Sequence, residues 1–316
     1  MHATHEVSRR HFLATASLAA AAVCLPLRVL RAEKTSPVIT IRNAAATAKI
    51  NVSKLRGNLS VIEGSGGNIT VLNTPDGKLL VEAGIPSSRP GITKALASVG
   101  DAPVKQLINT HWHFDHTDGN EWLHALGAEI IAHENTRKRM STSTRVEGWD
   151  FTFPPRPEGA LPTKVVGAEE TLDFNGTSIA LKYYGPAHTD SDLSVYFADA
   201  DVLCTGDTLW NPHYPFIDYS TGGSIDGHIQ AAAANVARVT DKTIVVPGHG
   251  KVGGKADLVA FHDMLVETRE KVAALKKQGR SLEQIVAAKP TAKYDEKFGG
   301  FVIDGKGFTG LVYAGV

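Results

Sequence analysis

The most regular pattern in the first third of the chain is a series of short apolar runs separated by turn residues. The runs at 59–63, 68–72 and 78–82 are rich in Val, Ile and Leu, and they are parted by Gly64-Ser-Gly-Gly and Thr74-Pro-Asp-Gly. Glycine, proline and aspartate favour tight turns, so this pattern predicts consecutive β-strands joined by hairpins.

Strand and helix patterns alternate along the remaining chain. The segment 256–277 has apolar residues at intervals of three and four, which is typical of an amphipathic helix. Further short apolar runs predict strands at 38–41, 50–52, 104–108, 129–132, 177–184, 193–197, 201–204 and 243–246. Periodic or alanine-rich segments predict helices at 91–98, 120–126, 134–140, 225–239 and 281–287. The sequence therefore indicates a mixed α/β fold.

Three segments lack a regular pattern. Residues 141–163 contain four prolines and several aromatic side chains, and 210–223 is a second aromatic segment, so we expect two long loops. Their aromatic side chains either line a substrate site or pack the loops onto the fold. Tyr214 and Tyr219 are candidates to donate a hydrogen bond to a substrate carbonyl or oxyanion. The glycine-rich tail to residue 316 gives no clear assignment.

A dense group of metal-ligand side chains follows the apolar run 104–108. His111 and His113 are two residues apart at the end of this predicted strand, so their side chains should point to the same side. Asp115 and His116 come next, in the turn where the backbone can bring them to the same point. Neutral imidazole and carboxylate suit zinc or iron, so we interpret this group as a metal site. Five other histidines are expected to form hydrogen bonds or lie on the surface, namely His124, His133, His213, His228 and His262.

The sequence His-x-His-x-Asp-His at 111–116 resembles the signature of the metallo-β-lactamase-fold hydrolases. Three downstream motifs resemble that family and come in the family's order, so that the likeness covers roughly residues 55 to 255. They are Gly-Pro-Ala-His with His188, Cys-Thr-Gly-Asp with Asp207, and Pro-Gly-His-Gly with His249. The resemblance implies a four-layer αβ/βα sandwich, built as a single domain over residues 33–316.

The same resemblance implies a binuclear centre with two Zn²⁺, with iron or manganese as other possible metals. His111, His113 and His188 would hold one metal, Asp115, His116 and His249 the other, and Asp207 would bridge them. A hydroxide shared by the metals would attack the carbonyl of an ester, lactone, thioester or β-lactam, and Asp115 is a candidate to accept its proton.

Two features bear on the substrate. The best-known class B β-lactamases have cysteine where this chain has Asp207, so the resemblance favours the glyoxalase II and lactonase types over the lactamases. Glyoxalase II itself fits less well, because no glutathione-binding signature is evident. A true β-lactamase, a mononuclear iron enzyme resembling the persulfide dioxygenases and a non-catalytic metal-binding protein remain as alternatives.

The amino terminus predicts export from the cytoplasm. Ser8-Arg9-Arg10-His11-Phe12-Leu13 precedes the apolar run 14–25, which fits a twin-arginine signal at 1–32 with processing near Ala32. We therefore expect a periplasmic or secreted protein without a stable membrane span after cleavage. Cys204 would be the only cysteine of the mature chain, which excludes an intramolecular disulfide.

The charge balance bears on the partner. Lysine plus arginine and aspartate plus glutamate number 33 each, so no net charge points to nucleic acid, and we expect a small-molecule substrate. The sequence does not indicate an oligomeric state.

Overall fold

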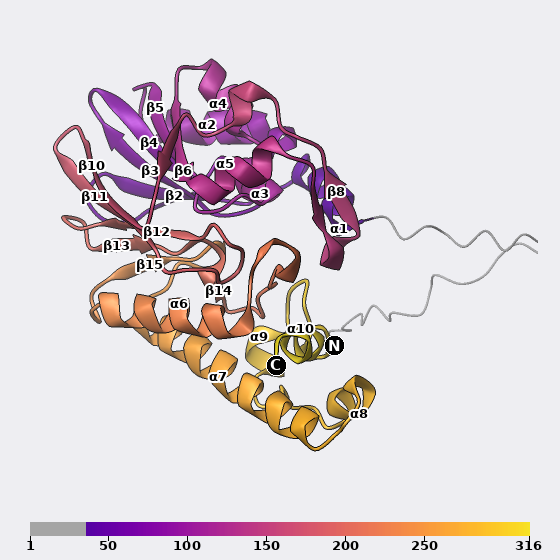
Figure 1. The fold of residues 1–316 in the computed structure, drawn as a ribbon. Coiled ribbons are helices and arrows are strands. Elements are labelled where there is room, and N and C mark those ends of the chain that lie inside the picture. The colour runs from indigo at the N-terminus through magenta and orange to yellow at the C-terminus, as the bar shows by residue number, and fades with distance from the viewer. Residues whose placement is uncertain (1–35) are drawn as a thin grey trace, which may run out of the picture. The chain divides into compact units, whose positions relative to one another are not determined.

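Two β-sheets lie face to face at the centre of the fold, and helices cover their outer faces (Figure 1). The computed structural model describes residues 36–316. The predicted twin-arginine signal and its processing site therefore lie outside the described residues. The described residues form one compact unit. Within the described part of the chain, the helices are too short or too polar to cross a bilayer.

The strands and helices have the following bounds. The strands are β1 Asn51–Lys54, β2 Leu59–Glu63, β3 Ile69–Thr74, β4 Gly77–Val81, β5 Val104–Ile108, β6 Glu129–His133, β7 Thr144–Val146, β8 Phe151–Phe153, β9 Lys164–Val166, β10 Glu169–Phe174, β11 Thr177–Tyr183, β12 Leu193–Phe197, β13 Val202–Cys204, β14 Trp210–Asn211, β15 Ile244–Val246 and β16 His249–Gly250. The helices are α1 Pro37–Ala45, α2 Arg89–Val99, α3 Phe114–Thr117, α4 Asn120–Ala125, α5 Glu134–Ser141, α6 Ile225–Arg238, α7 Lys255–Lys277, α8 Leu282–Ala287, α9 Asp295–Phe298 and α10 Gly305–Gly315.

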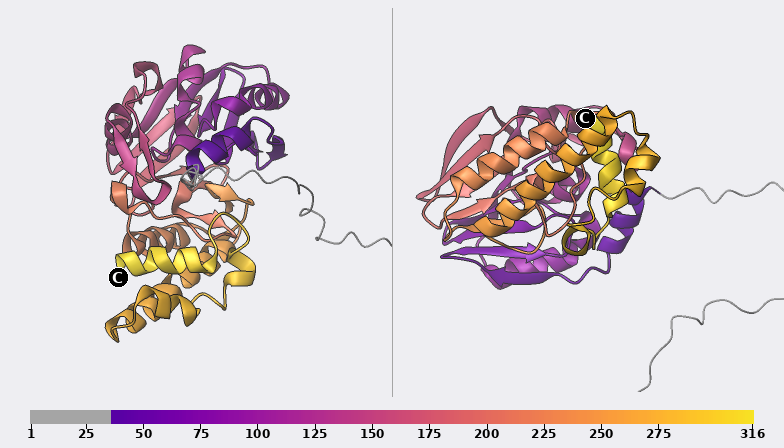
Figure 2. Two further views of the ribbon diagram at one scale, coloured as in Figure 1. Left: turned by 90° about the vertical axis from the view of Figure 1, so that its right-hand side faces the viewer. Right: turned by 90° about the horizontal axis from the view of Figure 1, so that it is seen from below.

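Burial shows that the fold has four layers. The first sheet has the strand order β1-β2-β3-β4-β5-β6-β9, and the second has β10-β11-β12-β13-β15. Their facing sides share one apolar core, to which Leu79 and Ile108 contribute from the first sheet and Val195 from the second. The outer side of the first sheet packs on α2 and α4, and α6 and α7 lie side by side over the second (Figure 2). The four-layer αβ/βα sandwich is thus confirmed.

The strand directions bring several loops to one edge of the sandwich. Strands β4, β5 and β6 are parallel, so their carboxyl ends lie at the same edge of the first sheet. In the second sheet β13 and β15 are parallel, and β11 has the same direction because two antiparallel pairings connect it to β13. The loops after β5, β11, β13 and β15 can therefore lie close together.

Most predicted elements are present, but two expectations are wrong. Residues 38–41 were expected to form a strand and instead belong to helix α1, because Ser36 caps the helix by accepting from Val38 N and Pro37 occupies its first position. The expected loop 141–163 contains a hairpin of β7 and β8, and its turn has Asp150 in the left-handed conformation (φ 46°).

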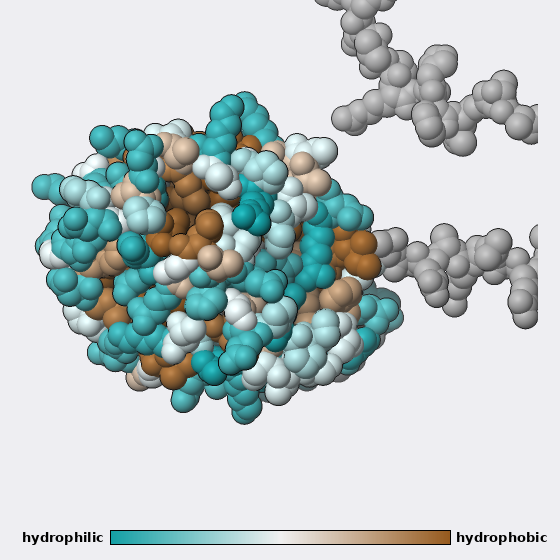
Figure 3. Space-filling view, turned by 90° about the horizontal axis from the view of Figure 1, so that it is seen from above, coloured by the Kyte–Doolittle hydropathy of each residue, from teal (hydrophilic) through white to brown (hydrophobic). Residues whose placement is uncertain are grey.

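Several other elements have no counterpart in the sequence prediction. Strand β10 pairs with β11 through a turn of Asn175 and Gly176, both with positive φ, a dipeptide that is a strong hairpin signal. Strand β9 forms one edge of the first sheet, and the tail forms α9 and α10. Helix α10 packs against α7 and α8. The face above α2 and α4 is largely hydrophilic, with several apolar patches between the polar side chains (Figure 3).

Candidate metal centre

Seven buried side chains meet at the sheet edge where the loops converge. The loop after β5 supplies His111 and His113, and the one-turn helix α3 supplies Asp115 and His116. The other three follow β11, β13 and β15, and these are His188, Asp207 and His249. All seven sequence-predicted site residues are therefore brought together.

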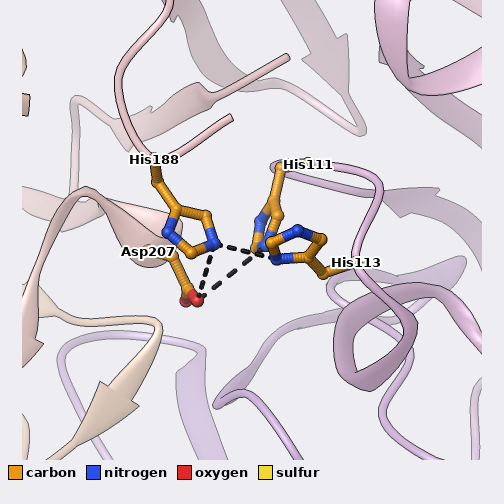
Figure 4. A group of neighbouring side chains, drawn as sticks. All are labelled: His111, His113, His188 and Asp207. Carbon is orange, nitrogen blue, oxygen red and sulfur yellow. Dashed lines mark hydrogen bonds and ion pairs between the residues drawn. The ribbon is translucent and has the colours of Figure 1, made fainter. Parts of the chain in front are cut away.

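The first group contains His111, His113, His188 and Asp207, whose potential ligand atoms all lie within 4.8 Å of one another (Figure 4). His188 Nε2 lies 2.9 Å from His113 Nδ1 and 3.3 Å from Asp207 Oδ2. His111 Nε2 lies 3.9 Å from the same oxygen. Three imidazoles and a carboxylate thus surround one point, as a tetrahedral zinc site requires.

The second group contains Asp115, His116 and His249. His249 Nε2 lies 3.2 Å from Asp115 Oδ2 and 3.3 Å from His116 Nε2. Asp207 also faces this group, because its Oδ1 lies 3.2 Å from His116 Nε2 and its Oδ2 lies 3.4 Å from His249 Nε2. Asp207 therefore stands between the two groups and contacts both.

Hydrogen bonds on the outer side of the first group determine which nitrogen of each imidazole carries the proton. His188 Nδ1 must donate to the Phe216 carbonyl oxygen, at 2.7 Å, so His188 Nε2 has a lone pair. His113 Nε2 donates to Asp218 Oδ2, at 3.0 Å, so His113 Nδ1 has a lone pair as well. These two lone pairs face each other at 2.9 Å. The arrangement is repulsive unless a cation or a proton lies beside both nitrogens.

One further inward-facing nitrogen supports a metal at this point. The His111 ring is completely enclosed, and its Nε2 has no hydrogen-bond partner among the described residues. A buried polar atom without a partner costs about 1–3 kcal/mol. A metal ion would satisfy this nitrogen together with the facing nitrogens of His113 and His188, so the residues fit a divalent cation.

The charges of the cluster are suited to metal binding. Burial lowers the pKa of His188 to about 3 and that of His111 well below its ordinary value, so both imidazoles are neutral and can offer a lone pair. Burial opposes a charge on His249 too, but the Asp207 and Asp115 carboxylates raise its pKa to about 9. The carboxylates thus attract positive charge into the cluster, which a proton or a metal can supply.

Two carboxylates outside the seven residues support the histidines, and sequence reasoning missed both. Asp218 accepts from His113, from the Ser220 backbone N–H and from the Thr221 hydroxyl. Glu82 lies 3.4 Å from His116 Nδ1 and accepts from Thr110 N and the Thr110 hydroxyl. Glu82 has a φ of 76°, an unfavourable conformation for this residue type, which indicates that its position is determined by surrounding contacts.

We expect the substitution Asp218→Asn to weaken metal binding about 10- to 100-fold. An asparagine can present its amide N–H to His113 Nε2, and this would favour the tautomer with the proton on the inward-facing Nδ1. Titration of the purified variant with zinc against a competing chelator would measure the change. The substitution Asp226→Asn, at an exposed aspartate on α6, is the control and should leave the affinity unchanged. Equal affinities for Asp218→Asn and the unsubstituted protein would show that this hydrogen bond does not orient His113.

Glycines let two loops close tightly over the cluster. A Cβ on Gly248 would lie 1.9 Å from Asp207 Oδ1, and one on Gly67 would lie 2.2 Å from His116 Cε1. Both are closer than real Cβ contacts, so any larger residue would displace a ligand-like side chain. The backbone of these two loops therefore packs directly against Asp207 and His116.

The aromatic residues of the two loops are divided between the site and the core. The Trp149 ring lies 4.5 Å from that of His113 and stacks on Phe216, and the Trp210 ring lies 4.7 Å from that of His249. The expectation that Tyr214 or Tyr219 donates to a substrate is not supported. Tyr214 donates to Asp295, at 2.9 Å, and Tyr219 donates to the Leu311 carbonyl, at 2.8 Å, so both hydroxyls hold the carboxy-terminal segment.

The chain is similar to known proteins of one superfamily. A family model described as the metallo-beta-lactamase superfamily matches residues 62–249. A hydroxyacylglutathione hydrolase of Polaromonas sp. is 28% identical over 159 residues, which are 50% of this chain and 52% of that protein. The chain thus spans about half the length of this relative. A metallo-beta-lactamase type 2 of Bacillus sp. (strain 170) is 27% identical over 243 residues, covering 72% of this chain and 86% of that protein.

Solved structures show the same fold at low identity. The DIM-1 metallo-beta-lactamase matches with a TM-score of 0.54 and 19% identity over 69% of this chain and 97% of its own. The sec-alkylsulfatase Pisa1 from Pseudomonas sp. matches with a TM-score of 0.63 and 15% identity, over 84% of this chain and 50% of its own. These two matches bear on the fold alone.

Proposed function

Because this chain belongs to the metallo-beta-lactamase superfamily, we propose that it is an exported, binuclear zinc-dependent hydrolase. Its substrate would contain an ester, lactone, thioester or β-lactam bond. The observation that carries the proposal is the convergence of two ligand groups on Asp207. His111 Nε2 lacks a hydrogen-bond partner among the described residues, and the lone pairs of His113 and His188 face each other. His111, His113 and His188 would hold one metal, Asp115, His116 and His249 the second, and Asp207 would bridge them.

The metals would supply two properties that the side chains alone lack, a water with a pKa near neutrality and polarisation of the substrate carbonyl. The chain supplies position and charge. The five histidines would be neutral donors with metal bound, so among the seven ligands only Asp115 and Asp207 would oppose the charge of two divalent cations, and the ligand layer itself would retain positive charge. That charge favours an anionic or carbonyl-containing small molecule.

We assign the proton-accepting role to Asp115. Its carboxylate lies at the second group, 3.2 Å from His249 Nε2, and the charges of His116 and His249 outweigh the effect of burial and lower its pKa to about 2. Without metal the carboxylate is therefore ionised, and a bound cation would take the place of the histidine charges that keep it so. Asp115 and His249 expose a larger fraction of their surface than the other five members of the cluster, so a proton on Asp115 can pass to solvent.

The identity of residue 207 favours ester, lactone or thioester bonds over lactams. The cluster has the carboxylate of Asp207 at a position where the best-known class B β-lactamases have a cysteine. Cys204 does not replace it, because its thiol is buried, donates to the Thr70 hydroxyl at 3.2 Å, and has a pKa that burial raises to about 12. Cys204 therefore remains a protonated core residue.

A true β-lactamase is the second candidate. It is favoured by the longer match to the Bacillus metallo-beta-lactamase type 2, which covers 86% of that protein against 52% of the hydroxyacylglutathione hydrolase. A mononuclear iron enzyme fits less well, because a facial triad needs three ligands and seven side chains converge here. Export rests on the twin-arginine pattern at Arg9 and Arg10 and implies a periplasmic or secreted enzyme.

The substrate class can be tested by hydrolysis of nitrocefin, a homoserine lactone, an aryl ester and an acyl thioester by zinc-loaded protein. We expect a value of kcat/KM for an ester, lactone or thioester that is at least about tenfold above that for nitrocefin, because the bridging residue is a carboxylate. Turnover of nitrocefin far above that of the other three would overturn this order and support the second candidate.

A further inference from the structure

Two members of the metal-ligand cluster, Asp115 and His249, are more accessible to solvent than the other five. Five of its seven residues expose at most 2% of their surface, whereas Asp115 and His249 expose 8% and 9%. A substrate must therefore approach past Asp115 and His249. Any side chain at this opening is placed to contact the part of the substrate that projects from the reacting carbonyl.

A loop near the carboxy terminus lies at this opening. Phe301, between α9 and α10, has its ring 6.3 Å from that of His249 and 5.9 Å from that of Trp210. It also stacks on His213, with the ring centroids 4.6 Å apart. Trp210 itself lies 4.7 Å from His249. Phe301 and Trp210 therefore form an apolar surface directly beside the second ligand group.

The loop is firmly held although its tip is exposed. Before the tip, Phe298 is buried and its carbonyl accepts from Tyr214 N, at 2.9 Å. After the tip, Asp304 caps α10 by accepting from Gly307 N at 2.7 Å. Gly305 packs so closely that a Cβ there would lie 2.1 Å from Asp295 Oδ1. The position of Phe301 is thus set by the fold before any substrate binds.

The exposure of this tip has no explanation in the packing of the described residues. Phe301 exposes 48% of its surface and Val302 exposes 61%, which places both among the few large apolar side chains that face solvent. Exposed apolar surface beside a reactive centre is typical of a substrate-binding wall, because covering it with an apolar group is favourable by about 25 cal/mol per Å².

We propose that Phe301, together with Trp210, binds an apolar acyl chain of the substrate beside the second ligand group. This inference rests on the proposed hydrolase function and assigns it a substrate class, namely esters or thioesters of hydrophobic acids. The acyl chain is attached to the reacting carbonyl, so it would extend from the metals toward the apolar surface beside His249. Phe301 acts here as a specificity-determining residue and takes no part in bond cleavage.

The substitution Phe301→Ala tests the proposal by comparing hydrolysis of 4-nitrophenyl octanoate and 4-nitrophenyl acetate. We expect kcat/KM for the octanoate to fall about tenfold and that for the acetate to change less than about twofold, because the short acyl group does not reach the ring. Leu126→Ala, which removes another exposed apolar side chain outside the site, is the control and should leave both values unchanged. An equal effect on the two esters would overturn the proposal.

Binding of the carboxylic acids separates this inference from the proposed hydrolysis. Calorimetric titration of zinc-loaded protein should show octanoate binding about tenfold more tightly than acetate, and Phe301→Ala should remove that difference. If neither ester were hydrolysed but this preference were present, the acyl-binding site would stand and the proposed reaction would be wrong. If both esters were hydrolysed and octanoate bound no better than acetate, the reaction would stand and the acyl-binding site would be wrong.

Discussion

Replacing Asp207 with alanine is expected to abolish hydrolysis and to reduce the bound zinc from two ions per chain to one or fewer. Asp207 faces both ligand groups, with Oδ2 3.3 Å from His188 Nε2 and Oδ1 3.2 Å from His116 Nε2, so neither group is complete without it. We expect kcat/KM to fall by at least about a thousandfold, because the nucleophilic water would lose most of its activation. Metal analysis and ester hydrolysis on the same preparation would measure both effects.

The matched control is Asp118→Ala, which removes an aspartate outside the two ligand groups whose side chain is only 6% exposed. Asp118 accepts from Arg42 at 2.8 Å and lies 2.6 Å from Arg156, so this variant measures the cost of removing a buried carboxylate. Such a change costs about 3–5 kcal/mol of folding free energy, but the variant should still bind two zinc ions. If Asp207→Ala also retained two zinc ions and full turnover, Asp207 would not be a bridging ligand.

Removal of the metals is expected to lower the stability of the folded protein by about 4 kcal/mol, relative to protein at free zinc a thousandfold above its dissociation constant. For a chain of this size, the loss corresponds to a decrease in Tm of roughly 10 °C. The physical cause is that the ligands meet only in the folded state, so zinc binds the folded chain in preference to the unfolded one. Thermal unfolding with a chelator and with excess zinc would measure the difference.

The Asp207→Ala variant distinguishes specific binding from a general effect of the chelator. Its Tm should depend much less on zinc than that of the unsubstituted protein, because the bridging ligand is absent. Identical unfolding curves of the unsubstituted protein with chelator and with zinc would mean that the seven side chains do not form a metal site that is coupled to folding.

The residues of the cluster could be predicted from sequence because most of the chemistry is local. Four of the seven lie between His111 and His116, directly after a regular strand, and the other three each follow a strand within a short glycine-containing motif. The parallel arrangement of β13 and β15 then brings Asp207 and His249 to one edge of the second sheet. The local pattern was sufficient for the group at 111–116, whereas His188, Asp207 and His249 were assigned through the resemblance of their motifs to the family.

The residues that support or border the cluster could not be predicted in the same way. Glu82 and Asp218 become significant only through contacts with His116 and His113, which are distant in sequence and form after the sheets have packed. Phe301 reaches the opening because two tail helices position its loop, and the glycine-rich sequence of the tail gave no helical period. Helix α1 was missed because its apolar β-branched residues favour a strand, whereas Ser36 and Pro37 start a helix.

The metal content of protein purified without added metal is the most direct test of the proposed binuclear centre. We predict close to two zinc ions per chain, bound to protein that has not been treated with a chelator, because both ligand groups are complete and share Asp207. One iron ion per chain, with oxygen consumption on a persulfide, or no bound metal at all, would contradict the binuclear zinc hydrolase.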